Sequence, residues 1–454
     1  MHDKHGLLSA PIPTVLRQMT VPMIFGLVAI LMFNLVDTFF ISLLGTEALA
    51  AISYTFPVTF VVNCITMGIG IGLSTNIGRL LGQGSENNAA HFSSHGILLA
   101  VVLVIVASSI GFITIEPLFL LLGAKQELIP LIEQYMQVWY LTIPLLVVPM
   151  TGNSVIRATG DTKTPAKIMM LAGIINGVLD PMLIFGYGPF PELGIQGAAI
   201  SSAFSWLGAL ICSFYVLIKR VKLLAVPHFP SLYKDWNQIL KIGTPAALST
   251  AMNPISGALL MMMLSSHGTA AVAAYGAAQR IESILILVLM SLTSSLTPFM
   301  AQNLGANNPT RSFAGLFISL RFSLLFQLMI FVMMVPLSIP LSKLFSQEAA
   351  VQDLLWHYLL VVPFSYGFQG VVMMLISALN ALHLPIKAFQ WSFMRLFVFT
   401  LPVAWIGSEI YGIEGLFIGI AAGNIAGGLL GYLYALWLRK THCVEASPSE
   451  NSAS

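Results

Sequence analysis

The sequence predicts an all-α polytopic membrane protein in which twelve transmembrane helices form two pseudo-symmetric six-helix bundles. Composition is the first reason, because 57% of the 454 residues are hydrophobic, 8% are charged and the mean hydropathy is +0.87. Soluble domains carry about 25% charged residues. The second reason is that apolar segments long enough to cross a bilayer recur along the chain. The third is that the two halves of the sequence repeat.

The apolar segments are separated by connectors that are rich in polar and turn-forming residues, such as GQGSENN (82–88) and ATGDTKTP (158–165). Each segment contains about 20 or more mostly apolar residues, the length that crosses a hydrocarbon core. The predicted spans are 18–44, 51–78, 92–115, 131–155, 165–187, 196–219, 241–264, 271–300, 311–335, 351–378, 387–408 and 414–439. We therefore expect an N-lobe (1–220), a cytoplasmic linker (221–240), a C-lobe (241–440) and a disordered cytoplasmic tail (441–454).

Basic residues are distributed unequally between the two sets of connectors. The N-terminus, the even-numbered connectors and the C-terminal end carry Lys4, Arg17, Arg79, Arg157, Lys163, Lys167, Lys219, Arg220, Lys222, Lys234, Lys241, Arg311, Lys387, Arg439 and Lys440. The odd-numbered connectors carry only Lys125 and Lys343, together with several acids. Because cytoplasmic loops of membrane proteins are enriched in Lys and Arg, we expect both termini to be cytoplasmic. The net charge of +2 gives no indication of nucleic-acid binding.

The second half of the sequence resembles the first at offsets of 218 to 223 residues. GTEALAA (45–51) corresponds to GTAAVAA (268–274), and LGIQGAAISS (193–202) corresponds to YGIEGLFIGI (411–420). Pro22 in the first span corresponds to Pro245 in the seventh. A parallel repeat of six spans predicts two lobes that face each other across a cavity near the bilayer midplane. The basic segment between spans six and seven is then the linker.

Two carboxylates lie within apolar segments of the first half. Asp37 is in FNLVDTFF of span one, and Asp180 is in NGVLDPML of span five. A charged side chain at the helix centre costs about 2.5–3.5 kcal/mol on insertion scales, so such residues usually have a function. Asn34 precedes Asp37 by about one turn, and Asn176 lies four residues before Asp180 on the same face. We predict a polar cluster that binds a proton or a cation; a hydrogen-bonded structural acid is the alternative.

The spans also contain a proline, two histidines and several charged residues that can have structural roles. Pro22 can allow span one to bend, since proline removes a backbone donor, although a first-turn proline can also be inert. His91 and His95 are spaced i, i+4 but have no acidic partner at metal-binding spacing, so we expect an interfacial pair. Arg280 and Glu282 lie two residues apart early in span eight, and Arg321 and Arg395 lie within about three turns of span ends, so we expect snorkelling or paired charges. The intramembrane acids are then in the N-lobe alone.

No nucleotide-binding or hydrolase motif is present in the sequence, and the three cysteines have no metal-binding spacing. The sequence therefore predicts no enzyme and no cofactor other than a coupling ion.

The whole chain resembles the multidrug and toxic compound extrusion (MATE) transporters. The twelve spans, LGTEALAA after span one, RATGDTKTP before span five and LGIQGAA before span six carry the resemblance. It implies two bundles that form a V around a central cavity, and export of cationic or amphipathic drugs in exchange for H⁺ or Na⁺. It also implies a multi-pass, monomeric protein of the cytoplasmic (inner) membrane that contacts lipids.

Within that family the chain resembles the DinF-type branch, in which the coupling acid lies in helix one. The resemblance assigns proton coupling to Asp37, Asn176 and Asp180, and a supporting role to Asn34, Tyr135 and Ser202. Pro22 matches the proline at which helix one bends. The NorM-type branch instead has acids in helices seven and ten, where this chain has NPISGALLM and SYGFQGVV. This difference favours protons over Na⁺, although oxygen-rich clusters also suit Na⁺.

These observations predict a secondary active multidrug antiporter. Asp37 would take a proton from the exterior, span one would bend at Pro22, and a lipophilic cation would be released. Three alternatives remain at this point: Na⁺-coupled drug antiport, a lipid or lipid-linked substrate flippase of a related fold, and a membrane-embedded enzyme. A flippase would require a strongly cationic cavity, and an enzyme would require a nucleophile, base or metal set that the sequence does not show.

Overall fold

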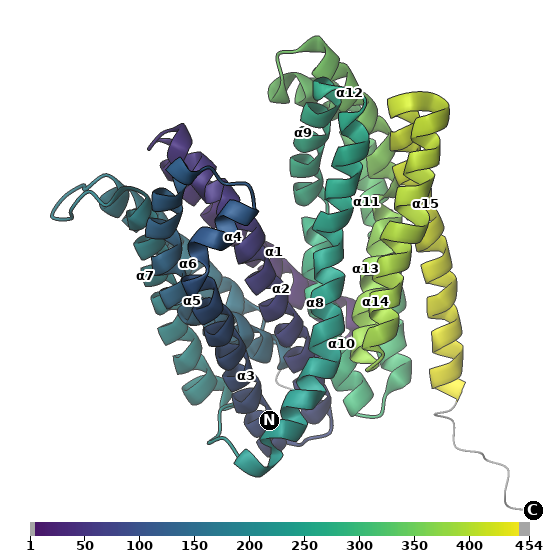
Figure 1. The fold of residues 1–454 in the computed structure, drawn as a ribbon. Coiled ribbons are helices and arrows are strands. Elements are labelled where there is room, and N and C mark those ends of the chain that lie inside the picture. Colours follow the sequence, from purple (N-terminus) through teal and green to yellow (C-terminus); the bar gives the residue numbers. More distant parts are fainter. Residues whose placement is uncertain (1–4, 445–454) are drawn as a thin grey trace, which may run out of the picture. The chain divides into compact units, whose positions relative to one another are not determined.

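The computed structural model describes residues 5–444, and within this range every regular element is helical. The elements of the first half are α1 (Ile12–Ser42), α2 (Thr46–Gly82), α3 (Glu86–Ile113), α4 (Ile115–Leu121), η1 (Gln126–Leu128), α5 (Ile129–Ala158), α6 (Lys163–Ile184), α7 (Gly194–Tyr215) and η2 (Val216–Val221). Those of the second half are α8 (Phe229–Ser265), α9 (Thr269–Leu285), α10 (Leu287–Gly305), α11 (Pro309–Phe345), α12 (Ala349–Val361), η3 (Val362–Ser365), α13 (Tyr366–Ala381), α14 (Pro385–Phe393), η4 (Met394–Thr400) and α15 (Leu401–Val444) (Figure 1).

Ten stretches of the described chain are individually long and apolar enough to cross a membrane, and α9 with α10 forms a further span that is bent by 45°. The last stretch, Pro385–Cys443, is interrupted at Tyr411 and Gly412, which leave the helical conformation. A Cβ built on Gly407 would lie 2.1 Å from the carbonyl oxygen of Gly415, and one on Gly423 would lie 2.5 Å from the Cα of Thr400. The chain therefore folds back on itself at Gly412, so this stretch contains two spans and the architecture accommodates the twelve predicted.

The chain divides into two compact units. The first contains Gln18–Ala247, and the second contains Gly6–Arg17 and the residues from Leu248 onward. The boundaries between these units fall inside α1 and α8, and the residues of the predicted linker (221–240) belong to the first unit. The predicted disordered tail (441–454) overlaps the end of α15, which is helical to Val444, and its remainder lies outside the described residues.

The short segment before α1 packs with the second unit, whereas the predicted N-lobe (1–220) includes it. Leu7 is buried there, and its backbone carbonyl accepts hydrogen bonds from Asn303 Nδ2 at 3.1 Å and from Arg311 Nε at 3.1 Å. These bonds satisfy the buried carbonyl of Leu7. Its two partners could not be predicted from the sequence pattern.

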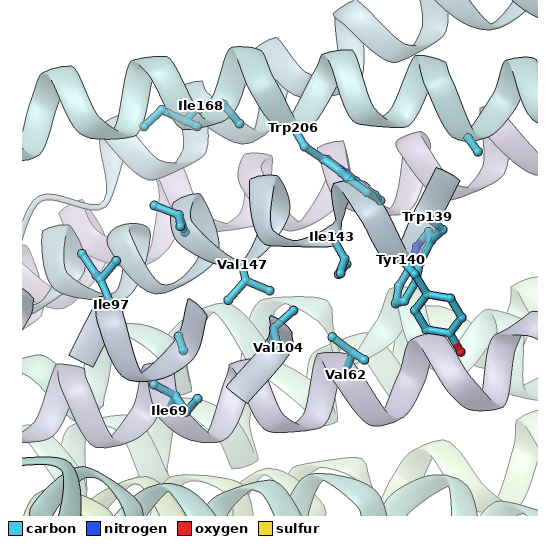
Figure 2. Close-up of a cluster of buried hydrophobic side chains, with 14 of the residues drawn as sticks. Val62, Ile69, Ile97, Val104, Trp139, Tyr140, Ile143, Val147, Ile168 and Trp206 are labelled. Atoms are coloured by element: carbon cyan, nitrogen blue, oxygen red, sulfur yellow. The ribbon is translucent and has the colours of Figure 1, made fainter. Parts of the chain in front are cut away.

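The core of the first unit surrounds α5, which packs against α2, α3 and α7. Figure 2 shows part of this core, in which Val62 of α2, Val104 of α3 and Val147 of α5 meet near Trp139 and Trp206. In the second unit α13 has the corresponding role and packs against α10, α11, α14 and α15. The central helix of each unit thus comes from its fourth predicted span.

The repeat is also visible in the backbone conformation. Gly45 and Gly268, at an offset of 223, precede the second helix of their units with φ of 115° and 103°. Gly194 and Gly412, at an offset of 218, start the last helix with φ of 55° and 63°. Such values are in a region that residues with a Cβ adopt rarely. The sequence repeat therefore specifies the same turns twice.

The segment after α7 is hydrogen-bonded to α3 within the first unit. His95 is fully buried, its Nδ1 lies 2.6 Å from Asp235 Oδ2, and its Nε2 accepts a hydrogen bond from the backbone N–H of His228 at 2.9 Å. Trp236 Nε1 donates to the carbonyl of His95 at 2.9 Å. The predicted interfacial histidine pair thus contains one residue that anchors the start of α8, and Asp235 is the acidic partner that sequence spacing did not reveal.

Candidate functional site

The first candidate site is built on the contact between α6 and α7. A Cβ built on Gly197 would lie 2.4 Å from the carbonyl oxygen of Leu183, so the two backbones touch. Ser201 is one turn further along α7 and reaches Asn176 of α6. Asn176, Asp180 and Ser201 are all fully buried. The glycine therefore permits a close helix contact that brings three polar side chains together in an apolar surrounding.

Asn176 is the centre of the hydrogen bonds in this cluster. Its Nδ2 donates to Asp180 Oδ1 at 3.0 Å and to Ser201 Oγ at 3.2 Å, and Ser201 Oγ donates to the carbonyl of Asn176 at 3.3 Å. Asp180 Oδ2 and Asn176 Oδ1 are buried and have no hydrogen-bond donor among the described residues. Buried acceptors of this kind are rare in folded proteins and usually indicate a bound proton, ion or water.

Helix α1 adds Asp37 to the cluster by packing against α6 through small residues. A Cβ built on Gly26 would lie 3.2 Å from the Cα of Ala166, and one on Gly177 would lie 3.8 Å from Val36. This register places the turn that carries Asp37 beside the turn that carries Asn176 and Asp180, and the two carboxylates interact electrostatically. Asp37 Oδ1 is also buried without a donor among the described residues.

No basic side chain of the described residues is among the electrostatic neighbours of Asp37 or Asp180. Tyr135 of α5 is buried and interacts electrostatically with both acids. The site therefore contains two carboxyl groups, an amide, a phenol and a serine in an apolar region. Charge on such carboxyl groups can be neutralised by a proton or by a cation, because burial of an isolated ionised carboxylate is costly.

The structure brings together most of the predicted site and corrects two details. The hydroxyl that contacts Asn176 belongs to Ser201 and not to the predicted Ser202, which is buried one residue further along α7. Asn34 is exposed, so the one-turn spacing from Asp37 does not place it inside the cluster with Asn176. The glycine-to-serine spacing of Gly197 and Ser201 was the signal in the sequence that could have identified the correct serine.

The proposed hinge lies within a continuous helix. Pro22 is inside α1, which is helical from Ile12 to Ser42. A close contact of α1 with α6 lies one turn later, at Gly26. The structure is thus one state of this helix, and bending at Pro22 stays a prediction.

A second polar cluster lies in the second unit, where the sequence predicted no functional acid. Glu282 of α9 and Arg395 of η4 line the same cavity, together with polar residues of α8, α13 and α15. Arg395 is 6% exposed and therefore does not snorkel to an interface. Of the two roles predicted for Arg395, snorkelling or pairing, snorkelling is wrong, because the linear distance from a span end does not show which way a helix face points.

Comparisons with known proteins give a consistent result. The family model MatE matches residues 22–182 and again residues 245–406, so each half matches and the two matches begin at Pro22 and Pro245. The FAD transporter of Shewanella oneidensis is 48% identical over 437 residues, which make up 96% of this chain and 97% of that protein. The probable multidrug resistance protein YpnP of Bacillus subtilis is 30% identical over 92% of this chain and 94% of that protein.

Solved structures share the whole fold. The Vibrio cholerae MATE transporter VcmN in its bent form is 32% identical, and the two chains superpose with a TM-score of 0.92 over 95% of this chain and 98% of that one. These similarities confirm the predicted membrane-protein class, the two-lobed repeat and the prediction that the chain is a transporter and not an enzyme.

Proposed function

The chain belongs to the MatE family of transporters, and from this premise we propose that it is a secondary antiporter that exports small organic molecules in exchange for protons. The observation that carries this proposal is the cluster of Asp37, Asn176 and Asp180, in which Asn176 and Asp180 are fully buried and Asp37 is partly buried. Three of its oxygen atoms have no donor among the described residues, and no basic side chain balances its charge. The net charge of the cluster is therefore set by what binds to it.

The proposed cycle uses the difference between the charged and neutral cluster. When Asp37 is ionised, the cluster favours a positively charged or strongly hydrated neighbour; when a proton arrives, that preference is lost. Coupling requires that the two conformations differ in affinity for the proton. We assign this difference to movement of α1 at Pro22, since the contacts at Gly26 and Gly177 would change if α1 bent. The bent form of the similar VcmN transporter supports a conformational change of this kind.

Na⁺ is the alternative coupling ion at the same cluster. Carboxylate, amide and hydroxyl oxygens are suitable ligands for hard cations. The proton is favoured because full burial of Asp180 and Asn176 leaves little room for the several oxygen ligands that a metal ion requires. We also propose, from the distribution of basic residues, that both termini are cytoplasmic and that the protein functions in the cytoplasmic membrane.

Two substrate classes follow from the relatives. The similar protein YpnP is named a probable multidrug resistance protein, which supports lipophilic cations as substrates. The 48% identity with the FAD transporter of Shewanella oneidensis supports a flavin dinucleotide, which is anionic through its diphosphate. We rank the lipophilic cation first, because unpaired carboxylates favour cations. The flavin dinucleotide is the second candidate, and it is supported by the sequence identity over nearly the whole chain.

One experiment tests both the coupling ion and the substrate. The purified protein is reconstituted into inside-out liposomes, and uptake of ethidium and of FAD is recorded by fluorescence under an imposed pH gradient, an Na⁺ gradient or neither. We expect uptake of at least one of these compounds to follow the pH gradient and to disappear in Asp37→Asn. Glu47→Gln, which alters an exposed carboxylate at the start of α2, is the matched control and is expected to transport normally. Normal transport by Asp37→Asn, or dependence on Na⁺ alone, would contradict the proposal.

A further inference from the structure

The second unit contains a polar cavity of about 110 Å³ that the proposed cycle does not use. It is bounded by α8, α9, α12, η3, α13, η4 and α15, and its lining includes Asn253, Tyr275, Glu282, Tyr366, Arg395 and Asn424. Sites for drug-sized molecules have volumes of roughly 300–1,000 Å³. This cavity is therefore too small for a whole organic substrate, and it has room for several water molecules.

Glu282 provides the negative charge of the cavity and is weakly partnered. Its Oε2 accepts hydrogen bonds from Tyr358 Oη at 3.3 Å and from Gln279 Nε2 at 3.4 Å, and its Oε1 accepts one from Gln369 Nε2 at 3.5 Å. Hydrogen bonds to an ionised carboxylate are usually about 2.5–2.9 Å long. The long distances indicate that the neighbouring groups do not lock the carboxylate in one position or in one charge state.

Arg395 provides the positive charge and is held away from Glu282. It lies in η4, a π-helical turn, and Thr400 Oγ1 donates to its backbone carbonyl at 2.8 Å. Turns of this kind inside helices are frequent at functional sites. Its Nη2 donates to Asn253 Oδ1 at 2.7 Å, while its buried Nε has no acceptor among the described residues. The two side chains interact electrostatically but form no direct ion pair within the described part of the chain.

A separated glutamate and arginine in one small cavity limit what can bind there. A metal cation would be repelled by the guanidinium group, which cannot lose its charge. A proton does not have this difficulty, because it binds to a carboxylate oxygen and leaves a neutral carboxylic acid. The other titratable groups that face Glu282 are Tyr275 of α9, Tyr358 of α12 and Tyr366 of α13, all of which can donate to the ionised form or accept from the protonated one.

We propose that this cavity is a second proton-binding site, in which the Glu282 carboxylate takes up and releases one proton per transport cycle and Arg395 is the fixed counter-charge of its ionised form. The proton comes from water on one side of the membrane and returns to water on the other, and no other bond is formed or broken. The inference rests on the proposed exchange of substrate for protons, and it adds one proton to those carried by the cluster around Asp37.

The test measures protonation directly and does not depend on knowing the substrate. Infrared difference spectra of the purified protein are recorded between mildly alkaline and mildly acidic buffer, and the carboxylic acid bands are compared. We expect Glu282→Gln to lose one band that the native protein and Asp37→Asn both show. Glu414→Gln, which alters an exposed glutamate near the Gly412 turn, is the matched control and is expected to retain it. Spectra of Glu282→Gln that are identical to those of the native protein would overturn the proposal.

A second measurement separates this site from a purely structural role. Tyr358→Phe removes one donor to Glu282 without changing any formal charge, and Arg395→Gln removes the counter-charge. We expect the pH at which the Glu282 band appears to change strongly in Arg395→Gln and slightly in Tyr358→Phe. If the band were unaffected in both, Glu282 would not belong to the cavity's charge pair. The transport assay of Asp37→Asn tests the proposed coupling site, and the infrared band tests the Glu282 site, so the failure of one proposal can be distinguished from the failure of the other.

Discussion

The two lobes share a helical framework but differ in how they arrange charge inside it. In the first unit, Asp37 and Asp180 lie side by side with no basic neighbour among the described residues. In the second unit, Glu282 shares a cavity with Arg395. The first cluster can hold a net negative charge, whereas the second is balanced when both groups are ionised. A duplicated fold can therefore supply two sites that respond differently to the same proton.

The difference has a structural origin in the central spans. The first-unit site depends on α6 and α7 touching at Gly197, which excludes water and buries Asp180 completely. In the second unit, the corresponding region contains the π-helical turn η4, and Arg395, Leu396 and Thr400 of this turn line the cavity. Close packing buries the first site, whereas the second site lies beside a local departure from regular helix.

The largest expected effect comes from neutralising the acid of each lobe. Asp180→Asn keeps the shape of the side chain but removes its charge and its ability to bind a proton. We expect it to reduce pH-gradient-driven uptake to the level of empty liposomes, because the first cluster is the proposed coupling site. Glu282→Gln is expected to transport more slowly but still to respond to the pH gradient. Initial rates at several imposed gradients provide the measurement, and equal effects of the two variants would show that the lobes are not specialised.

The next effect concerns two glycines that are equivalent in the repeat. A Cβ at Gly197 would lie 2.4 Å from the carbonyl oxygen of Leu183, and one at Gly415 would lie 2.0 Å from the carbonyl oxygen of Gly407. Because neither carbonyl can move without shifting a helix, we expect each alanine variant to lose about 1–3 kcal/mol of unfolding free energy. Thermal unfolding in detergent measures this loss.

Gly276 provides the control for these two variants. It lies on α9, and a Cβ there would meet nothing within 4 Å. Gly276→Ala should therefore be tolerated, and an exposed helical alanine can even be slightly stabilising. If Gly197→Ala or Gly415→Ala melted at the same temperature as Gly276→Ala, the close helix contacts would not be those described.

The smallest expected effect is the loss of unfolding free energy when a serine of the first cluster is replaced. Ser201→Ala removes the hydroxyl that accepts from Asn176 Nδ2, although Asn176 keeps its bond to Asp180. Hydrogen bonds between membrane helices contribute on average about 0.6 kcal/mol and at most about 1.7 kcal/mol. We expect a decrease in this range, and a smaller one for the neighbouring Ser202→Ala, in the same unfolding assay. The reverse order would restore Ser202 to the site.

Much of the fold could be predicted from the sequence because its determinants are local or periodic. Span length follows from the thickness of the hydrocarbon core, and the positions of Pro22 and Pro245 already revealed the repeat that the two MatE matches confirm. The predicted spans were shorter than the helices at many ends. For example, span seven was predicted from residue 241, whereas α8 begins at Phe229. Hydropathy marks the apolar part of a helix, so it does not show where a helix ends beyond that part.

The site was predicted less completely, and the reason is the direction in which side chains point. Asn176 and Asp180 share a helix face, so their spacing sufficed to place them together. Asn34 precedes Asp37 by a similar spacing, but α1 is poorly covered and Asn34 is exposed. Glu282 was assigned to a span end, because no pattern in the sequence shows that α9 turns this face towards Arg395.

The sequence by itself determined the membrane-protein class, the twelve spans, the duplication and the turns at Gly45, Gly194, Gly268 and Gly412, because each depends on residues that are close together along the chain. The tertiary structure decided which polar groups meet. Ser201 was chosen over Ser202 by the contact of two helices, and Glu282 was brought into one cavity with Arg395 by the packing of seven elements. Such contacts join residues far apart in the sequence, and they depend on helix rotation and on close backbone approach, which hydropathy and spacing do not encode.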